Sequence, residues 1–153
     1  MAAQPDAWSC ALRLLSRREL SEAGLQERLR RRGFGEEEIT QTLTRCREYR
    51  YVDDERFARL RARQLLSAGR AVGPALLIDL KQQRIGETVA REVIAALEEE
   101  FSQAEILQEL CQRRFPDFDY RTADDRTRRR VFNYLRRRGF APALLFQYFT
   151  QER

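Results

Sequence analysis

The 153-residue sequence contains no histidine. This absence excludes Ser-His-Asp and Cys-His nucleophilic systems and removes the imidazole ligand of nearly every common zinc site. No GxxxxGK[ST] or GxGxxG segment is present to cradle a phosphate. Asp53, Asp54 and Glu55 form a compact acidic cluster that suggests Mg²⁺, but consecutive residues at a helix start point in different directions and are better explained as capping. We therefore expect no catalytic residue, no metal and no cofactor.

Glycine and proline are also scarce, with 7 and 4 residues. That is little material for the turns of a β-sandwich, whereas Leu, Arg, Glu, Ala and Gln dominate and are strong helix formers. The composition predicts an all-α fold.

Cysteine is present but does not form a disulfide pattern. Cys10, Cys46 and Cys111 are odd in number and far apart, which favours a reducing compartment. Residues 1–6 have no basic region or long apolar run, so we expect no signal peptide. No apolar stretch approaches the ~20 residues of a membrane helix. We expect a soluble cytoplasmic protein that does not bind membranes.

Three segments of the chain share one pattern, at residues 25–34, 76–85 and 131–140. In each, an apolar residue is followed four positions later by Leu, and Phe or Ile follows five positions after that. The first interval places both apolar residues on one face of a helix. Such internal similarity predicts a helical repeat.

A turn is expected directly after each shared helix. Gly33 and Gly139 stand where a helix ends in a left-handed residue, and the next apolar residue folds back onto the core. Arg84 occupies this place in the middle copy. Because a left-handed Arg costs roughly 1 kcal/mol, an altered turn is the alternative there.

Further apolar residues at spacings of three and four flank the shared segments, so each repeat should contain three helices. These residues are Trp8, Leu12 and Leu15; Ile39, Leu43 and Cys46; Ala58, Ala62 and Leu65; Val89, Val93 and Leu97; Ile106, Leu110 and Cys111; and Leu144, Leu145, Tyr148 and Phe149.

Helix start and stop signals agree with this division. Asp53 can cap one helix, Pro74 suits a first helical position, Ser102 begins a capping box, and Pro116 ends a helix. We predict about nine helices in three tandem repeats, at residues 1–52, 53–100 and 101–153. Stacked repeats of this kind form an elongated, curved body.

The charge of the chain is asymmetric. The net charge is +5 and the sequence pI about 9.5. Lys81 is the only lysine among 29 basic residues, which favours planar contacts with phosphate or carboxylate, although genomic base composition also raises Arg over Lys. Residues 101–153 carry 11 basic and 7 acidic side chains, against 8 and 9 in residues 53–100. This excess favours contact of the end repeats with a polyanion or an acidic protein over a merely solvated face.

Arginine runs recur in the last turn of the shared helix in two repeats. Cations there complement the helix dipole, worth ~0.3–1 kcal/mol, but three in succession also cover outward faces. A second group in the middle repeat follows spacings of three, four and seven, and either continues a basic stripe or pairs internally with Glu55, Asp79 or Glu87. The candidate contact residues are Arg30, Arg31, Arg32, Arg56, Arg59, Arg63, Arg70, Arg128, Arg129, Arg130, Arg136, Arg137 and Arg138.

Residues 51–58, Tyr-Val-Asp-Asp-Glu-Arg-Phe-Ala, followed by Gly73-Pro74 and Leu80, resemble the central signature of RecX proteins. Residues 11–15 with Ser21 and residues 25–34 resemble the first repeat of that family, and residues 132–140, with their Leu-x-x-Arg-Gly-Phe element, resemble the third. The chain departs from the family pattern at Arg50 and Arg84, where glycine is usual, and both changes concern turn geometry.

The resemblance implies tandem three-helix repeats without a catalytic site or cofactor. It also implies a monomeric regulator of recombination and the SOS response that binds RecA and RecA filaments on single-stranded DNA. Such binding usually inhibits ATP hydrolysis, strand exchange and co-protease activity, and weak direct DNA binding is an additional expectation. A duplex-binding transcription regulator is the alternative; a hydrolase or nuclease is disfavoured by the missing histidine and carboxylate cage.

Two leucines in equivalent repeat positions test the repeat alignment. Leu80→Ala and Leu135→Ala should each lower the free energy of unfolding by ~2–5 kcal/mol, because each leaves a cavity in a packed core. Thermal and denaturant unfolding measure the loss, and unchanged melting temperatures for both variants would show that the alignment is wrong.

Overall fold

The computed structural model describes residues 3–151, and within this range the chain forms nine α-helices and no strand. The all-α prediction is therefore confirmed. The helices are α1 (Ala7–Arg17), α2 (Glu22–Arg31), α3 (Glu36–Glu48), α4 (Asp54–Ser67), α5 (Pro74–Gln82), α6 (Glu87–Glu100), α7 (Gln103–Arg114), α8 (Asp125–Arg137) and α9 (Pro142–Thr150).

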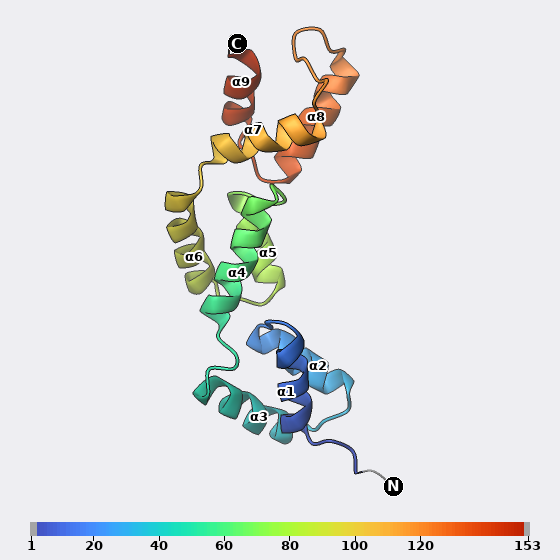
Figure 1. The fold of residues 1–153 in the computed structure, drawn as a ribbon, viewed down its shortest axis with the longest axis vertical. Helices are drawn as coiled ribbons and strands as arrows, with labels where there is room; N and C mark the ends of the chain where they lie inside the picture. Colours follow the sequence, from blue (N-terminus) through green and yellow to red (C-terminus); the bar gives the residue numbers. More distant parts are fainter. Residues whose placement is uncertain (1–2, 152–153) are drawn as a thin grey trace.

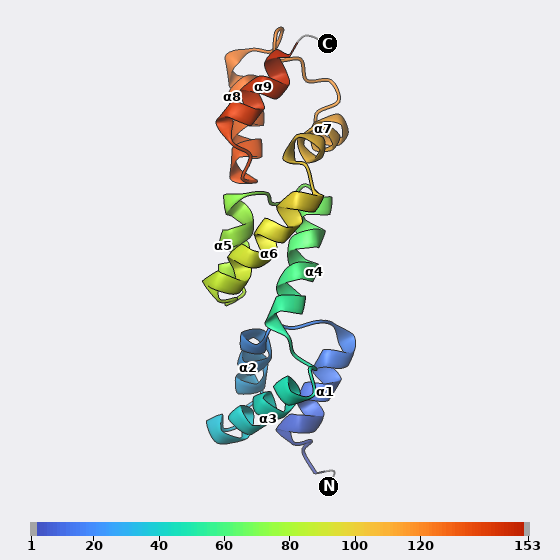
Figure 2. The same cartoon turned by 90° about the vertical axis from the view of Figure 1, so that its left-hand side faces the viewer.

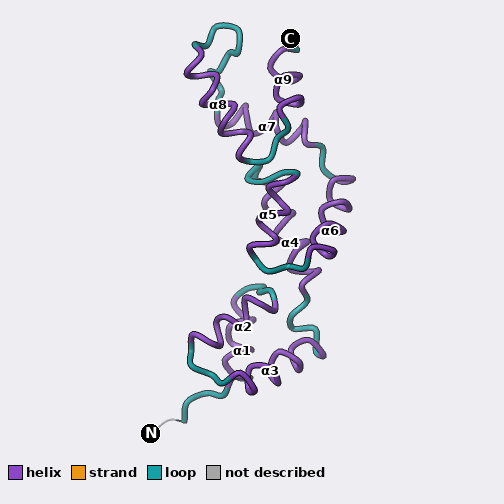
Figure 3. The backbone as a smooth tube through the Cα atoms, turned by 180° about the vertical axis from the view of Figure 1, so that it is seen from behind, coloured by secondary structure: helices purple, strands orange, loops and turns teal. Residues whose placement is uncertain are grey.

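The helices form three groups of three that follow one another along the long axis of the molecule (Figures 1 and 2). The N-terminal group α1–α3 and the C-terminal group α7–α9 lie at opposite ends, with α4–α6 between them. The resulting body is elongated and gently curved (Figure 3), as the repeat pattern predicted. No helix within residues 3–151 has the length and apolar character needed to cross a membrane.

The predicted start and stop signals are found in place. The Asp53 carboxylate accepts a hydrogen bond from the Arg56 amide at 3.0 Å, and the Ser102 hydroxyl accepts one from the Glu105 amide at 3.4 Å. Each contact satisfies a backbone donor that a helix start would otherwise leave unpaired. Pro74 occupies the first turn of α5, and α7 ends two residues before Pro116.

The second helix of every repeat ends in the same turn. Gly33, Arg84 and Gly139 are left-handed, with φ of 87°, 58° and 104°. In each case the amides of the left-handed residue and of the next residue donate back to the helix, over 2.9–3.4 Å. This is the Schellman arrangement, which satisfies carbonyl groups at a helix end. The alternative of an altered turn at Arg84 is wrong, since the arginine adopts the conformation of the glycines.

The shared segments supply the centre of the core. Leu29, Leu80 and Leu135 are fully buried, and Ile85 and Phe140 fold back beneath the turns as predicted. Phe57 is partly buried against the cluster that contains Leu80 and Leu135.

One predicted helix face is wrong. Leu12 of α1 is exposed, at 37% of its accessible area, and the buried face of this helix consists of Ala7, Cys10 and Ala11. Small residues let α1 approach its neighbours closely, while the larger Trp8 and Leu15 stay at the edge of the cluster. Both the predicted face and the buried face follow helical spacings of three and four residues. The face with the smaller side chains is the one that packs in the core.

The two joints between repeats differ in kind. The first repeat has a hydrophobic cluster of its own, whereas α4–α9 share a single cluster. At the first joint the Glu22 amide donates to the Asp54 carboxylate at 2.9 Å, and Arg56 pairs with Glu19 at 3.0 Å. Burial raises the pKa of Asp54. Polar contacts accompany the first joint, and apolar burial dominates the second.

The second joint also brings two backbones into contact. The Val72 amide donates to the Arg138 carbonyl at 2.8 Å, and the Arg138 guanidinium donates to the Gly69 carbonyl at 3.0 Å. A Cβ atom at Gly139 would lie 1.9 Å from the Val72 carbonyl oxygen. Since the second and third groups share a core, the division at residues 1–52, 53–100 and 101–153 into separate units stays a prediction.

Gly33 and Gly139 separate the cost of the left-handed turn from the cost of this close approach. Gly33→Ala should cost about 1 kcal/mol, because an added Cβ meets no atom within 4 Å and only the backbone conformation is strained. Gly139→Ala should cost clearly more, because the Cβ collides with backbone that cannot move without opening the joint. Urea unfolding measures both; equal losses would contradict the proposed contact.

Candidate nucleic-acid interface

Helix α8 is the most basic element of the protein. It begins at the Asp124 cap, whose carboxylate accepts a hydrogen bond from the Thr127 amide at 2.7 Å. This hydrogen bond, with a smaller contribution from Arg130, lowers the pKa of Asp124. Six arginines follow within the helix, at positions 126, 128, 129, 130, 136 and 137. They cannot all face the core, so α8 presents several guanidinium groups to solvent.

One face of α8 combines these charges with other chemistry. Arg129, Phe132, Asn133 and Arg136 are spaced three, four and seven residues apart, which places them on a single stripe. Phe132 is partly buried, and the other three are exposed. The stripe therefore offers cations at both ends, with a ring and a carboxamide between them.

The stripe forms one wall of a shallow groove of about 280 Å³. Phe146 of α9 lies across from it, half exposed, with its ring centroid 5.1 Å from that of Phe132. Tyr120, from the loop between α7 and α8, lies 5.9 Å from Phe132. The residues that line the groove are Tyr120, Arg128, Arg129, Phe132, Asn133, Arg136, Pro142 and Phe146. Pro142 is the one aliphatic side chain among them.

The arginines around the groove differ in how firmly the protein holds them. Arg128 donates to the carbonyls of Tyr120 at 2.8 Å and Arg121 at 3.1 Å, and its guanidinium lies 4.9 Å from the Tyr120 ring centroid. It thereby fixes the loop to α8. Arg129 and Arg136, in contrast, make no side-chain hydrogen bond or ion pair with any residue between 3 and 151. These two guanidiniums are available to an external anion.

The run at residues 136–138 is not uniformly outward, contrary to our expectation. Arg138 is partly buried, bonds to Gly69 and lies 4.3 Å from the ring centroid of Tyr134. Its role in the structure is to join the second and third repeats. Arg137 donates to the Asn133 carbonyl at 3.2 Å. Of the three, Arg136 alone makes no side-chain hydrogen bond or ion pair with the part of the chain that the structure describes.

The first repeat carries a weaker basic surface. Arg30 pairs with Glu36 at 2.6 Å, which lowers the pKa of that carboxyl, and Arg31 pairs with Glu27 at 3.0 Å. Arg32 has no such partner in the described chain. The runs at 30–32 and 136–138 hold equivalent sequence positions, but their bonding differs. Two arginines of the first run pair with acidic side chains, whereas two of the second bond to backbone carbonyls.

The arginines of the middle repeat are mostly paired internally. Arg59 pairs with Glu55 at 2.9 Å, as one alternative had it, and Arg63 pairs with Glu100 at 2.9 Å. The two other acids considered as partners bind different cations: Asp79 binds Arg61, and Glu87 binds Lys81 and Arg91.

The two remaining candidates of the middle repeat differ. Arg56 bonds to Glu19 of the first repeat, and the Arg70 side chain has no partner within residues 3–151. Exposed pairs are worth ~0–1 kcal/mol and are readily exchanged for other anions.

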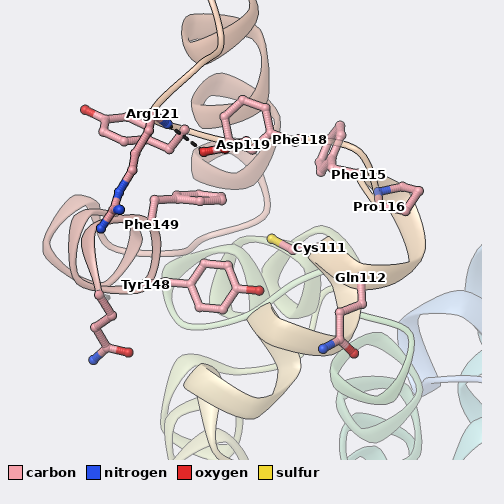
Figure 4. A pocket seen from close by; sticks show the side chains of 11 residues that line it. Cys111, Gln112, Phe115, Pro116, Phe118, Asp119, Arg121, Tyr148 and Phe149 are labelled. Atoms are coloured by element: carbon pink, nitrogen blue, oxygen red, sulfur yellow. Dashed lines mark hydrogen bonds between the residues drawn. The ribbon is translucent and has the colours of Figure 1, made fainter. Parts of the chain in front are cut away.

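A second hollow lies at the C-terminal end, between α7, the loop at residues 115–121 and α9 (Figure 4). It has a volume of about 310 Å³, and the aromatic rings of Phe115, Phe118, Tyr148 and Phe149 line much of it. None of the candidate arginines reaches it. No group of three or more metal-ligating side chains occurs within residues 3–151.

The aromatic and amide residues of the groove were missed by the sequence analysis. The sequence pattern places Phe132 and Asn133 within the repeat without indicating a binding role, and it does not single out Tyr120 or Phe146. The spacing of Arg129, Phe132, Asn133 and Arg136 was a local signal that could have revealed one wall. The other wall depends on how α9 packs on α8.

An extended helical repeat with exposed arginines on its surface has the build of a binding protein. Comparison with known proteins identifies the family. A family model described as "RecX, first three-helix domain" matches residues 7–46. Over the full length of both chains, the sequence is 72% identical to regulatory protein RecX of Syntrophotalea carbinolica. It is 30% identical to regulatory protein RecX of Trichlorobacter lovleyi over 95% of each chain. This chain belongs to the RecX family of regulatory proteins.

Solved structures share the fold. A crystal structure of regulatory protein RecX superimposes with a TM-score of 0.77 at 23% identity, covering 95% of this chain and 70% of the other. The crystal structure of RecX from Lactobacillus salivarius gives a TM-score of 0.72 at 16% identity, covering 93% and 91%. The helical architecture is thus kept at low sequence identity.

Two arginines at the C-terminal end of α8, Arg136 and its C-cap Arg138, should differ in their contribution to stability. Arg138→Ala should lower the free energy of unfolding by about 1.5–3 kcal/mol, because a charged hydrogen bond to the Gly69 carbonyl is lost. Arg136→Ala should change it by less than about 0.5 kcal/mol. Thermal unfolding of both variants checks the difference, and equal melting temperatures would remove Arg138 from the joint.

Proposed function

We propose that this chain regulates homologous recombination and the SOS response by binding RecA and RecA filaments on single-stranded DNA. In this proposal it modulates, and chiefly inhibits, ATP hydrolysis, strand exchange and co-protease activity. Membership of the RecX family of regulatory proteins is the observation that carries the proposal. The protein acts as a monomer in the cytoplasm, by binding and without catalysis.

The shape of the molecule supports this function. Three repeats in line give an elongated body (Figure 1), a shape that suits contact with more than one subunit of a filament. A ligand shifts a conformational equilibrium only by binding one state more tightly than the other. A rod seated across neighbouring RecA subunits inhibits turnover when it fits the filament geometry that cannot complete ATP hydrolysis.

The distribution of free charge indicates how the rod attaches. Within residues 3–151, Arg129 and Arg136 have no side-chain partner at one end of the body, Arg32 has none at the other, and Arg70 has none between them. Arg30, Arg31, Arg56, Arg59 and Arg63 can join them by exchanging their acidic partners, and Arg130 and Arg137 extend the surface of α8. Arg128 and Arg138 also belong to the proposed contact set. Their contribution is smaller, because their guanidiniums already bond to carbonyl groups of the protein itself.

A duplex-binding transcription regulator explains this pattern less well. Such proteins place one short recognition helix in the major groove, whereas the free arginines here are spread over three repeats. Co-sedimentation with RecA, with and without single-stranded DNA, tests the proposal directly. The protein should appear with the filament, and sequence-specific duplex binding at physiological salt without RecA binding would support the alternative.

The double variant Arg129→Gln/Arg136→Gln tests the attachment by charge. It should bind RecA–single-stranded DNA filaments more weakly, and more of it should be needed to inhibit ATP hydrolysis. If both arginines contact phosphates of a single strand, the slope of log affinity against log salt should become shallower by about 1.4. Filament binding over a salt series measures both effects.

The matched control is Lys81→Gln/Arg91→Gln. It removes the same formal charge from two cations that already pair with Glu87. Its affinity should stay closer to that of the wild type. Equal losses in the two double variants would show that net charge, and not the α8 surface, governs attachment.

A further inference from the structure

The groove between α8 and α9 contains more than an electrostatic surface needs. Phosphate attachment requires only cations, yet an exposed ring of α9 faces a ring and a carboxamide of α8 between the two free guanidiniums. Phe146 remains half exposed while its ring contacts Phe132 at 5.1 Å between centroids. An exposed apolar residue is ordinary by itself. Its contact with Phe132 in the same groove as Arg129 and Arg136 is the informative observation.

The chemistry of the walls favours flat, aromatic occupants. Rings and a carboxamide line the groove together with guanidiniums, and a single proline is the one aliphatic side chain among the lining residues. An aromatic face accepts any nucleobase, since every base has a π-face. The Asn133 carboxamide carries both donors and an acceptor, so it can bond to the edge of a base.

The charges at the ends of the groove fit a strand that continues past the base. Arg129 and Arg136 are seven residues apart on α8, which separates them by about 10 Å along the helix axis. Neither has an acidic partner within residues 3–151, and Asp125, the nearest acid of the helix by sequence, lies 3.6 Å from Arg128 instead. An anion on each side of a central ring matches a base flanked by its backbone phosphates.

We propose that this groove holds an unstacked base of a single-stranded nucleic acid against Phe146, with neighbouring phosphates on Arg129 and Arg136. The inference rests on the proposed function, because it assigns the single strand of the filament to one surface of the third repeat. An acidic peptide satisfies the guanidiniums equally well, but it leaves the exposed ring without a planar partner. Binding that depends on bases therefore distinguishes the two occupants.

The test compares two strands of about 15 nucleotides, a length that covers the usual site sizes. One is oligothymidine, and the other is an abasic strand with the same number of phosphates. Fluorescence anisotropy at low salt gives both affinities. The wild-type chain should bind oligothymidine about fivefold or more tightly than the abasic strand, as expected for one stacked base.

Phe146→Leu removes the π-face but keeps an apolar contact with Phe132, so the fold is preserved. This variant should bind the two strands within about twofold of each other, while Phe146→Tyr should keep the preference of the wild type. Leu60→Ala is the control, because Leu60 of α4 is similarly exposed, at 42%, and lies outside the groove. Its preference for bases should be unchanged, and melting temperatures confirm that each variant is folded.

Equal affinity of the wild type for both strands overturns the inference, as does a full preference for oligothymidine in Phe146→Leu. Inhibition of ATP hydrolysis by RecA, measured in parallel, keeps the two proposals apart. If the wild-type chain inhibits RecA but shows no preference for bases, base binding in the groove is refuted and the proposed regulation of RecA stands. If the chain shows a Phe146-dependent preference for bases but neither binds nor affects RecA, the proposed regulation is refuted and base binding in the groove stands.

Discussion

Every repeat depends on a chain reversal through a left-handed residue at the end of its second helix. The reversal sets the direction in which the third helix leaves, and it places Phe34, Ile85 or Phe140 back against the repeat. Two amides donate into the preceding turn, so the reversal leaves few carbonyls unpaired. Arg84 pays a conformational penalty to make the same turn, which shows how strongly the packing on both sides demands it. In the first and third repeats, arginines occupy the helical turn before this reversal, where the helix dipole favours positive charge.

Much of the fold could be predicted because its signals are local. Intervals of three and four residues identify helix faces, and capping residues and prolines mark their ends, so the helices and their grouping followed from the sequence. The errors arose where distant parts of the chain meet. Leu12 loses its place in the core to smaller residues because α1 packs closely on its neighbours. Arg138 resembles an outward charge until the loop at Gly69 is brought beside it.

The functional surface was harder to predict than the fold. Sequence spacing identified the arginines but not their partners, since Glu19 reaches Arg56 from the loop between α1 and α2 and Glu100 reaches Arg63 from α6. The groove adds rings from α8, from α9 and from the loop before α8, and only tertiary packing brings these together. Local periodicity can therefore suggest which residues are charged and exposed. It does not say which of those charges the protein has already neutralised.

The unlike joints between the repeats have a mechanical consequence. The second and third repeats, held by a common apolar core and a backbone contact, act as one lever. At the first joint, water can replace the hydrogen bond of Asp54 and the ion pair of Arg56 without disrupting either apolar cluster. The exposed ion pair of Arg56 weakens as ionic strength rises, whereas the apolar core of the second joint is not screened in this way. The molecule thus consists of a long segment joined by a common apolar core and a short N-terminal segment whose attachment is sensitive to salt.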